Sequence, residues 1–158
     1  MLGVASASDR EIAVLERRAR SPSESVRIEA QRELGQARRV RSLSRYYAGW
    51  AGYYGALLEG DASGASRAVR DFGFLLDSTE QRPTLERLPM RLLQFEHVSR
   101  AAIGVALCFS LEQRHNEAVR WIDALARAPE LAPEARDQLR AAGMVVLAGA
   151  SEWGALSD

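Results

Sequence analysis

The residues AAIGVALCFSLEQRHNEAVRWIDALARAP, at positions 101–129, decide the fold class. The first part, as far as Leu111, belongs to a long apolar run typical of a buried helix. After the turn QRHNE, apolar residues recur at helical spacing in Ala118, Ile122 and Leu125, and Pro129 ends the pattern. The stretch therefore predicts two helices joined by a short turn.

Helical patterns of the same kind fill the rest of the chain, and no segment alternates with period two long enough to indicate a strand. Gly60 and Asp61 predict a turn, because glycine can take the left-handed conformation and aspartate can cap the next helix. We expect an all-α fold of about seven to eight helices in a single domain over residues 1–158. The predicted helices cover 8–19, 22–37, 42–59, 65–76, 90–113, 116–128 and 133–149. Residues 77–89 are expected to form a loop with at most a short turn, and the tail 151–158 is expected to fray unless Trp153 docks.

Composition places the chain in the range of one globular domain, with 158 residues, 47% hydrophobic and 27% charged. The sequence contains no uncharged apolar run of eighteen residues, and residues 1–8 do not resemble a secretory signal. We therefore expect a cytoplasmic protein with no membrane segment. Cys108 is the single cysteine, which excludes an internal disulfide, and its apolar neighbours favour a buried, inert thiol.

All 21 basic residues are arginine, as the codon bias of a GC-rich genome favours. The chain has no lysine that could form a Schiff base or supply the cation of a phosphate-binding P-loop. The net charge is zero, but residues 1–50 hold ten arginines and six acidic residues, whereas residues 51–158 hold eleven and fifteen. The zero net charge argues against a protein whose main task is coating nucleic acid. It does not exclude a local basic patch in residues 1–50.

Two segments resemble known helical repeats. SPSESVRIEAQRELG, at 21–35, is similar to the second helix of a HEAT repeat. Val26-Arg27, Ala30 and Leu34-Gly35 stand where that family tends to place Val-Arg, a small residue and Leu-Gly. The stretch 101–129 resembles a tetratricopeptide hairpin through Ala106, Phe109, Ala118, Ile122, Leu125 and Pro129, and the segment 50–76 does so through Gly60-Asp61 and Ala65. Ala65 and Ala118 are 53 positions apart, whereas the tetratricopeptide period is about 34 residues. The resemblance implies a divergent, solenoid-like array of antiparallel helical hairpins whose concave face binds a segment of another protein.

The segment RRVRSLSRYYAGWAGYYG, at 38–55, carries four arginines, all four tyrosines and one tryptophan. On a helix, Tyr46, Trp50, Tyr53 and Leu57 form one stripe, and such a stripe is more often core than binding face. Small residues, including Gly49 and Gly52, occupy the opposite side and allow another backbone to approach. We therefore expect the aromatic side chains to be mostly buried.

Arg38, Arg41 and Arg45 form a cationic stripe beside the aromatic one. Its most common role is a solvated face or pairing with acids such as Glu29 and Glu33; recognition of a partner carboxylate and phosphate binding are the alternatives. Nucleic-acid stacking platforms need aromatic faces and cations on one solvent-facing surface, and here the two are separated.

Catalysis has little support in the sequence. His97 and His115 are the only histidines and belong to no metal-binding or nucleophile motif, and GDASGAS, at 60–66, lacks the strand and lysine of a phosphate loop. No nucleophile, base and orienting group can be proposed together. We expect no enzyme activity, no metal site and no cofactor.

The hypothesis is therefore a non-enzymatic interaction module that binds a peptide or helix of a partner, or a second copy of itself, in a helical groove. Its candidate partner-binding residues are Arg41, Arg45, Tyr47, Tyr54 and Arg100. The alternative is nucleic-acid binding through Arg38, Arg39, Arg41, Arg45 and Trp50. Homodimerisation through the apolar stretch 144–153 is a separate expectation, with Val145, Val146 and Trp153 as candidates.

Overall fold

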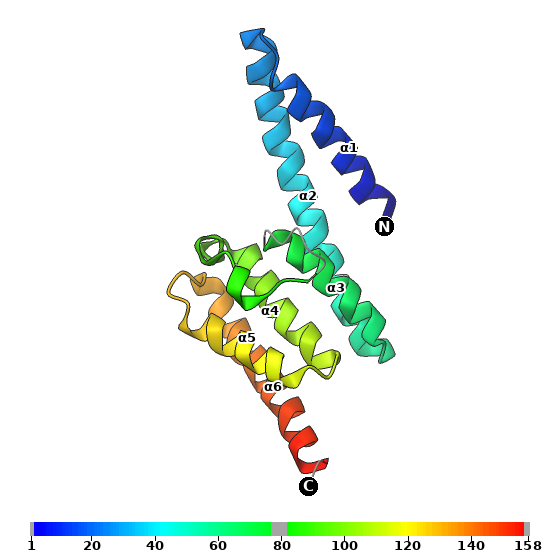
Figure 1. Cartoon of the computed structure of the whole chain (residues 1–158), viewed down its shortest axis with the longest axis vertical. Coiled ribbons are helices and arrows are strands. Elements are labelled where there is room, and N and C mark those ends of the chain that lie inside the picture. Colours follow the sequence, from blue (N-terminus) through cyan, green and yellow to red (C-terminus); the bar gives the residue numbers. More distant parts are fainter. Residues whose placement is uncertain (1, 77–81, 157–158) are drawn as a thin grey trace. The chain divides into compact units, whose positions relative to one another are not determined.

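The computed structural model describes residues 2–76 and 82–156, with side chains for 9–76 and 82–151. In these residues the protein consists of six α-helices and three short 3-10 helices, with no strand (Figure 1). The all-α class is thus confirmed, whereas the count of seven to eight helices and the solenoid-like arrangement are not. The chain divides into two compact units, residues 1–47 and 48–158. The expectation of one domain stays a prediction, since the boundary lies inside a continuous helix.

Unit 1 consists of α1 (Leu2–Arg18) and the first part of α2 (Glu24–Glu59). Its core is small: Ile12 and Leu15 of α1 pack with Leu34 of α2, and Ala37 lies against them. The start of α1 differs from the expectation, because the helix begins at Leu2 and the predicted helix begins at residue 8. Residues 2–7 contain no proline, so nothing in them prevents the helix from extending.

The predicted helices 22–37 and 42–59 are one helix of 36 residues. Residues 38–41, RRVR, contain neither glycine nor proline, and arginine is a good helix former. The separation expected there was therefore wrong, and this accounts for one helix of the difference in number.

In unit 2, the last part of α2 packs against α3 (Ala62–Leu75) through small residues. A Cβ atom on Gly52 would lie 3.2 Å from the Cβ of Ala68, and one on Gly64 would lie 3.1 Å from the Cβ of Ala56. The turn between the helices is as predicted: Gly60 has a φ of 67°, and the Asp61 side chain accepts a hydrogen bond from Ser63 N at 2.8 Å. Close helix packing at this point depends on the absence of side-chain bulk.

The centre of unit 2 is α4 (Glu96–Leu111), which packs against α3, α5 (His115–Arg127) and α6 (Arg136–Leu156). The ring of Phe72 is fully buried between two glycines, since a Cβ on Gly49 or on Gly104 would come within 2.5 Å of it. Trp121 of α5 is also buried and donates a hydrogen bond from Nε1 to the carbonyl oxygen of Ala102 at 2.7 Å.

The predicted helix over 90–113 is interrupted. Residues Met90–Gln94 form a 3-10 helix, η2, and Phe95 is extended before α4 begins. The carbonyl of Leu93 accepts hydrogen bonds from the Ser99 hydroxyl and from Ala132 N, the latter at 2.9 Å. The Leu93 carbonyl oxygen therefore bonds to groups other than the backbone N–H four residues later, and this explains why the helix is broken here. Two further 3-10 helices, η1 (Leu85–Arg87) and η3 (Pro133–Ala135), complete the unit.

The C-terminal helix is longer than expected. α6 continues to Leu156, so the expectation of a frayed tail is wrong for residues 151–156. None of the described helices combines the length and hydropathy that a membrane span requires.

Candidate interaction site

Two arginines of the predicted basic stripe pair with carboxylates of α1 inside unit 1. Arg38 Nη2 lies 2.9 Å from Glu16 Oε1, and Arg41 Nη1 lies 3.1 Å from Asp9 Oδ1. The side chain of Arg41 is only 24% exposed. These ion pairs are intramolecular, which is the most common role of such a stripe. The carboxylates, however, belong to α1 and are not the ones suggested from the sequence.

The two acidic residues that the sequence suggested as partners of the basic stripe pair with a different arginine, Arg18. Glu33 and Glu29 lie 3.1 Å and 3.9 Å from the guanidinium of Arg18. Of the remaining nucleic-acid candidates in this segment, Arg45 is half-buried, whereas Arg39 is exposed and pairs with no carboxylate in the described chain. Much of the positive charge near residues 38–41 is thus neutralised within unit 1.

The aromatic residues of α2 differ widely in exposure. Tyr53 is 6% exposed, and its burial raises the pKa of its hydroxyl, whereas Tyr46 and Trp50 are half-buried. Tyr47 and Tyr54 are 66% and 54% exposed. The expectation of mostly buried aromatics is therefore wrong for these two tyrosines. For Tyr54 the physical reason is that, inside unit 2, α3 packs on small residues of α2 such as Gly52 and leaves Tyr54 uncovered.

Unit 2 carries an exposed apolar surface on its part of α2, formed by Trp50, Tyr54, Leu57 and Leu58 and called here the Tyr54 patch. These residues follow i, i+4, i+7 and i+8 spacing, so they share one face of the helix. Leu57 is 49% and Leu58 86% exposed, and the rings of Trp50 and Tyr54 lie 5.8 Å apart. Half-buried Trp50 also contacts the core through Phe72, at a ring distance of 5.2 Å.

The other predicted site residues belong to α4 and α6 and not to this patch. Arg100 pairs with Glu96 one turn earlier on α4, at 2.7 Å. On α6, Val146 is fully buried, so it cannot serve as a self-association residue in this fold; Val145 is 55% exposed. The side chain of Trp153 lies outside the described residues.

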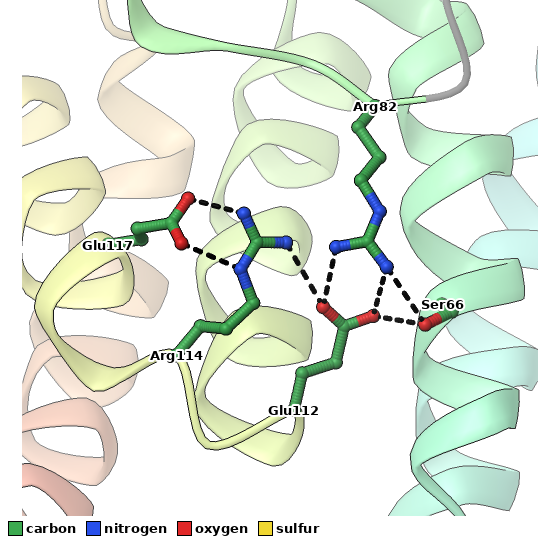
Figure 2. Close-up of polar contacts among 5 residues, drawn as sticks. All are labelled: Ser66, Arg82, Glu112, Arg114 and Glu117. Atoms are coloured by element: carbon green, nitrogen blue, oxygen red, sulfur yellow. Dashed lines mark hydrogen bonds and ion pairs between the residues drawn. The ribbon is translucent and has the colours of Figure 1, made fainter.

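A polar network that the sequence did not indicate joins three segments of unit 2 (Figure 2). The side chain of Glu112 is only 7% exposed and lies 3.2 Å from nitrogens of both Arg82 and Arg114. It also accepts a hydrogen bond from the Ser66 hydroxyl. Arg114 then binds Glu117 through two parallel hydrogen bonds, that from Nε measuring 2.7 Å. The sequence could have indicated only the Arg114–Glu117 pair, because these residues are three positions apart. Ser66, Arg82 and Glu112 are distant in the sequence and are brought together by the fold.

A cavity of about 310 Å³ lies beside this network, between the segment 82–86 and helices α4 and α5. Its wall includes Phe109, Arg114, Glu117, Arg120 and Trp121. The guanidinium of Arg114 stacks over the Phe109 ring at 4.3 Å, which fixes one side of the opening. The lining of the cavity thus combines apolar and charged side chains.

The thiol and the histidines give no reactive arrangement among the described residues. Cys108 is buried, and desolvation raises the pKa of its thiol well above the usual range, so it stays protonated. No group of three His, Cys, Asp or Glu side chains in the described chain is placed to hold a metal ion.

Comparisons with protein-family models, with curated proteins and with solved structures found no match.

Proposed function

We propose that the protein is a non-enzymatic interaction module that binds a helix of a partner protein through the Tyr54 patch. The observation that carries the proposal is the exposure of Tyr54, Leu57 and Leu58 on one face of α2, at 54%, 49% and 86%. Helices that dock on one another present apolar anchors at i, i+3, i+4 and i+7 spacing, and Tyr54, Leu57 and Leu58 have the i, i+3, i+4 part of this pattern. Tyrosine and tryptophan are also common among the residues that dominate binding interfaces.

The opposite side of α2 gives the patch a firm base. The glycines at 49 and 52 seat the helix closely on α3 and Phe72, so the exposed side chains project from a packed element. A rigid support reduces the entropy lost on binding. The resemblance of 101–129 to a tetratricopeptide hairpin adds support for a binding role; Ala106, Ala118 and Leu125 of that stretch are fully buried.

Site-specific photo-cross-linking tests this function. A photoreactive phenylalanine analogue at position 54 or 58 should capture one polypeptide in extracts of the native cells. The same analogue at Arg127, which is 78% exposed on α5, serves as the control position and should not. Adding unlabelled Tyr54→Ser/Leu58→Ser protein should leave the adduct in place, whereas unlabelled wild type should compete it away.

The mass of the adduct distinguishes the two kinds of partner. A mass of two chains would identify a second copy, and any other mass would identify a different protein. Equal labelling from positions 54, 58 and 127, together with a monomeric mass at every concentration, would refute the proposal.

A further inference from the structure

We propose that the cavity between segment 82–86 and helices α4 and α5 binds a small organic monocarboxylate, with Arg120 as the residue that recognises the carboxylate. The inference concerns a different surface from the Tyr54 patch and does not depend on it. The volume, about 310 Å³, is at the lower end of the range for small-molecule sites, roughly 300–1,000 Å³.

Of the three arginines that line the cavity, Arg120 is the one that forms no ion pair with a described residue. Arg82 and Arg114 are both engaged with Glu112, and Arg114 also holds Glu117 in a two-pronged arrangement (Figure 2). Arg120 is exposed and forms no ion pair with any residue that the structure describes. Its planar fork of donors matches the geometry of a carboxylate.

The two carboxylates of the wall are already bound elsewhere. Glu117 is held by Arg114. Glu86 bonds to its own backbone N–H and to the Thr84 hydroxyl, and these hydrogen bonds, with a smaller contribution from the charge of Arg120, lower the pKa of Glu86. Arg120 is therefore close enough to Glu86 to influence it without being paired with it.

The charge count favours a ligand with a single negative charge over one with two. Arg82, Arg114 and Arg120 are balanced by Glu86, Glu112 and Glu117, so the cluster is neutral as a whole. A dianion such as a phosphate monoester would meet several fixed carboxylates without a net positive field to offset them. A monoanion needs only the fork of Arg120, and its apolar body can lie against Pro83, Leu85 and Phe109.

Binding of 3-phenylpropionate, compared with its neutral amide, tests the inference by protein-observed NMR titration of the full chain. The acid should bind at least about tenfold more tightly than the amide, because a charge-assisted hydrogen bond is stronger than a neutral one. Arg120→Gln should remove that preference and leave amide binding unchanged. Arg127→Gln is the matched control, since Arg127 is on the same helix, outside the cavity, and pairs with Asp123 at 2.7 Å.

Unchanged thermal unfolding of Arg120→Gln would show that the loss is local. Equal binding of acid and amide, retention of the preference in Arg120→Gln, or no titration by either probe would overturn the inference. Tyr54→Ser protein should bind the acid as wild type does, so failure here and failure of the proposed interaction function are separate results.

Discussion

At the scale of single residues, the positions of glycine decide how closely helices approach in unit 2. Gly49 and Gly55 are on the same helix, yet a Cβ at 49 would come within 2.5 Å of the Phe72 ring, and one at 55 would meet nothing within 4 Å. Because Phe72 is fully buried, its ring has no free space into which to move. The two glycines therefore differ in role although they look alike in sequence.

Alanine substitution at these two glycines should have opposite effects. Gly49→Ala should destabilise the protein by about 1–3 kcal/mol through overpacking. Gly55→Ala should stabilise it by roughly 0.5–1 kcal/mol, because alanine is the better helix former. Urea unfolding of both variants measures the difference, and an equal shift of the two midpoints would contradict it.

Asp61 links stability to pH. Hydrogen bonds from the hydroxyl and backbone N–H of Ser63 lower the pKa of the Asp61 carboxyl. A carboxyl whose pKa is lower in the folded state stabilises the fold above its ordinary value, about 3.9, and loses that contribution as the pH falls through the folded value.

The melting temperatures of wild type and Asp61→Ala should therefore differ more at neutral pH than in acid below about pH 3. Thermal unfolding followed by circular dichroism at both pH values makes the comparison. A difference independent of pH would mean that the ionised carboxylate is not what caps α3.

At the scale of elements, the network around Glu112 ties α3, α4 and the segment before η1 together. Glu112→Ala would leave the Arg82 and Arg114 guanidinium groups without this carboxylate and should destabilise the protein by about 1.5–3 kcal/mol. Glu117 is 49% exposed, so Glu117→Ala should lower stability by less than about 1 kcal/mol. Urea unfolding of the two variants checks this order, and equal losses would show that burial does not matter here.

The two neighbouring valines of α6 give an equally sharp contrast. Val146→Asp places a charge in the core and should destabilise by at least about 3 kcal/mol, whereas Val145→Asp, at a 55% exposed position, should change stability by less than about 0.5 kcal/mol. Self-association through α6 stays a prediction. Val145→Asp is the variant that can test it, because light scattering can compare its mass with wild type without loss of the fold.

The sequence predicted the elements that depend on local signals and missed those that depend on distant ones. Gly60, Asp61 and Ser63 lie within four consecutive residues, so their turn and cap could be predicted. The break at Phe95 could not, because it depends on a hydrogen bond from Ala132 to Leu93. The sequence also could not decide which face of α2 is buried, because the aromatic residues and the small residues both recur with helical spacing.

The candidate site divides in the same way. Tyr54 is a candidate from its residue type and position, and its binding role stays a prediction; the structure shows that it is exposed, whereas the aromatics were expected to be mostly buried. Arg82, Glu112 and Arg120 come from separate segments and belong to no short motif, so only the fold could bring them together.

At the scale of the whole molecule, charge argues for weak binding to nucleic acid. Arg38 and Arg41 are paired in unit 1, and residues 51–158 carry more acidic than basic residues. We expect an oligonucleotide titration, followed by fluorescence anisotropy, to give a Kd no tighter than about 10⁻⁴ to 10⁻⁶ M at physiological salt. A tight, salt-sensitive complex that Arg41→Ala/Arg45→Ala abolishes would instead establish nucleic-acid recognition as the primary function.

The continuity of α2 also determines where the chain can be divided. Proteases act on extended segments, and the boundary between residues 47 and 48 lies within a hydrogen-bonded helix instead of a linker. A fragment that stopped at Tyr47 would end in mid-helix and leave the last four carbonyls without their helical partners. Division at the segment 19–23 keeps α2 whole and leaves it packed against α3, so any dissection of this protein has to treat that helix as indivisible.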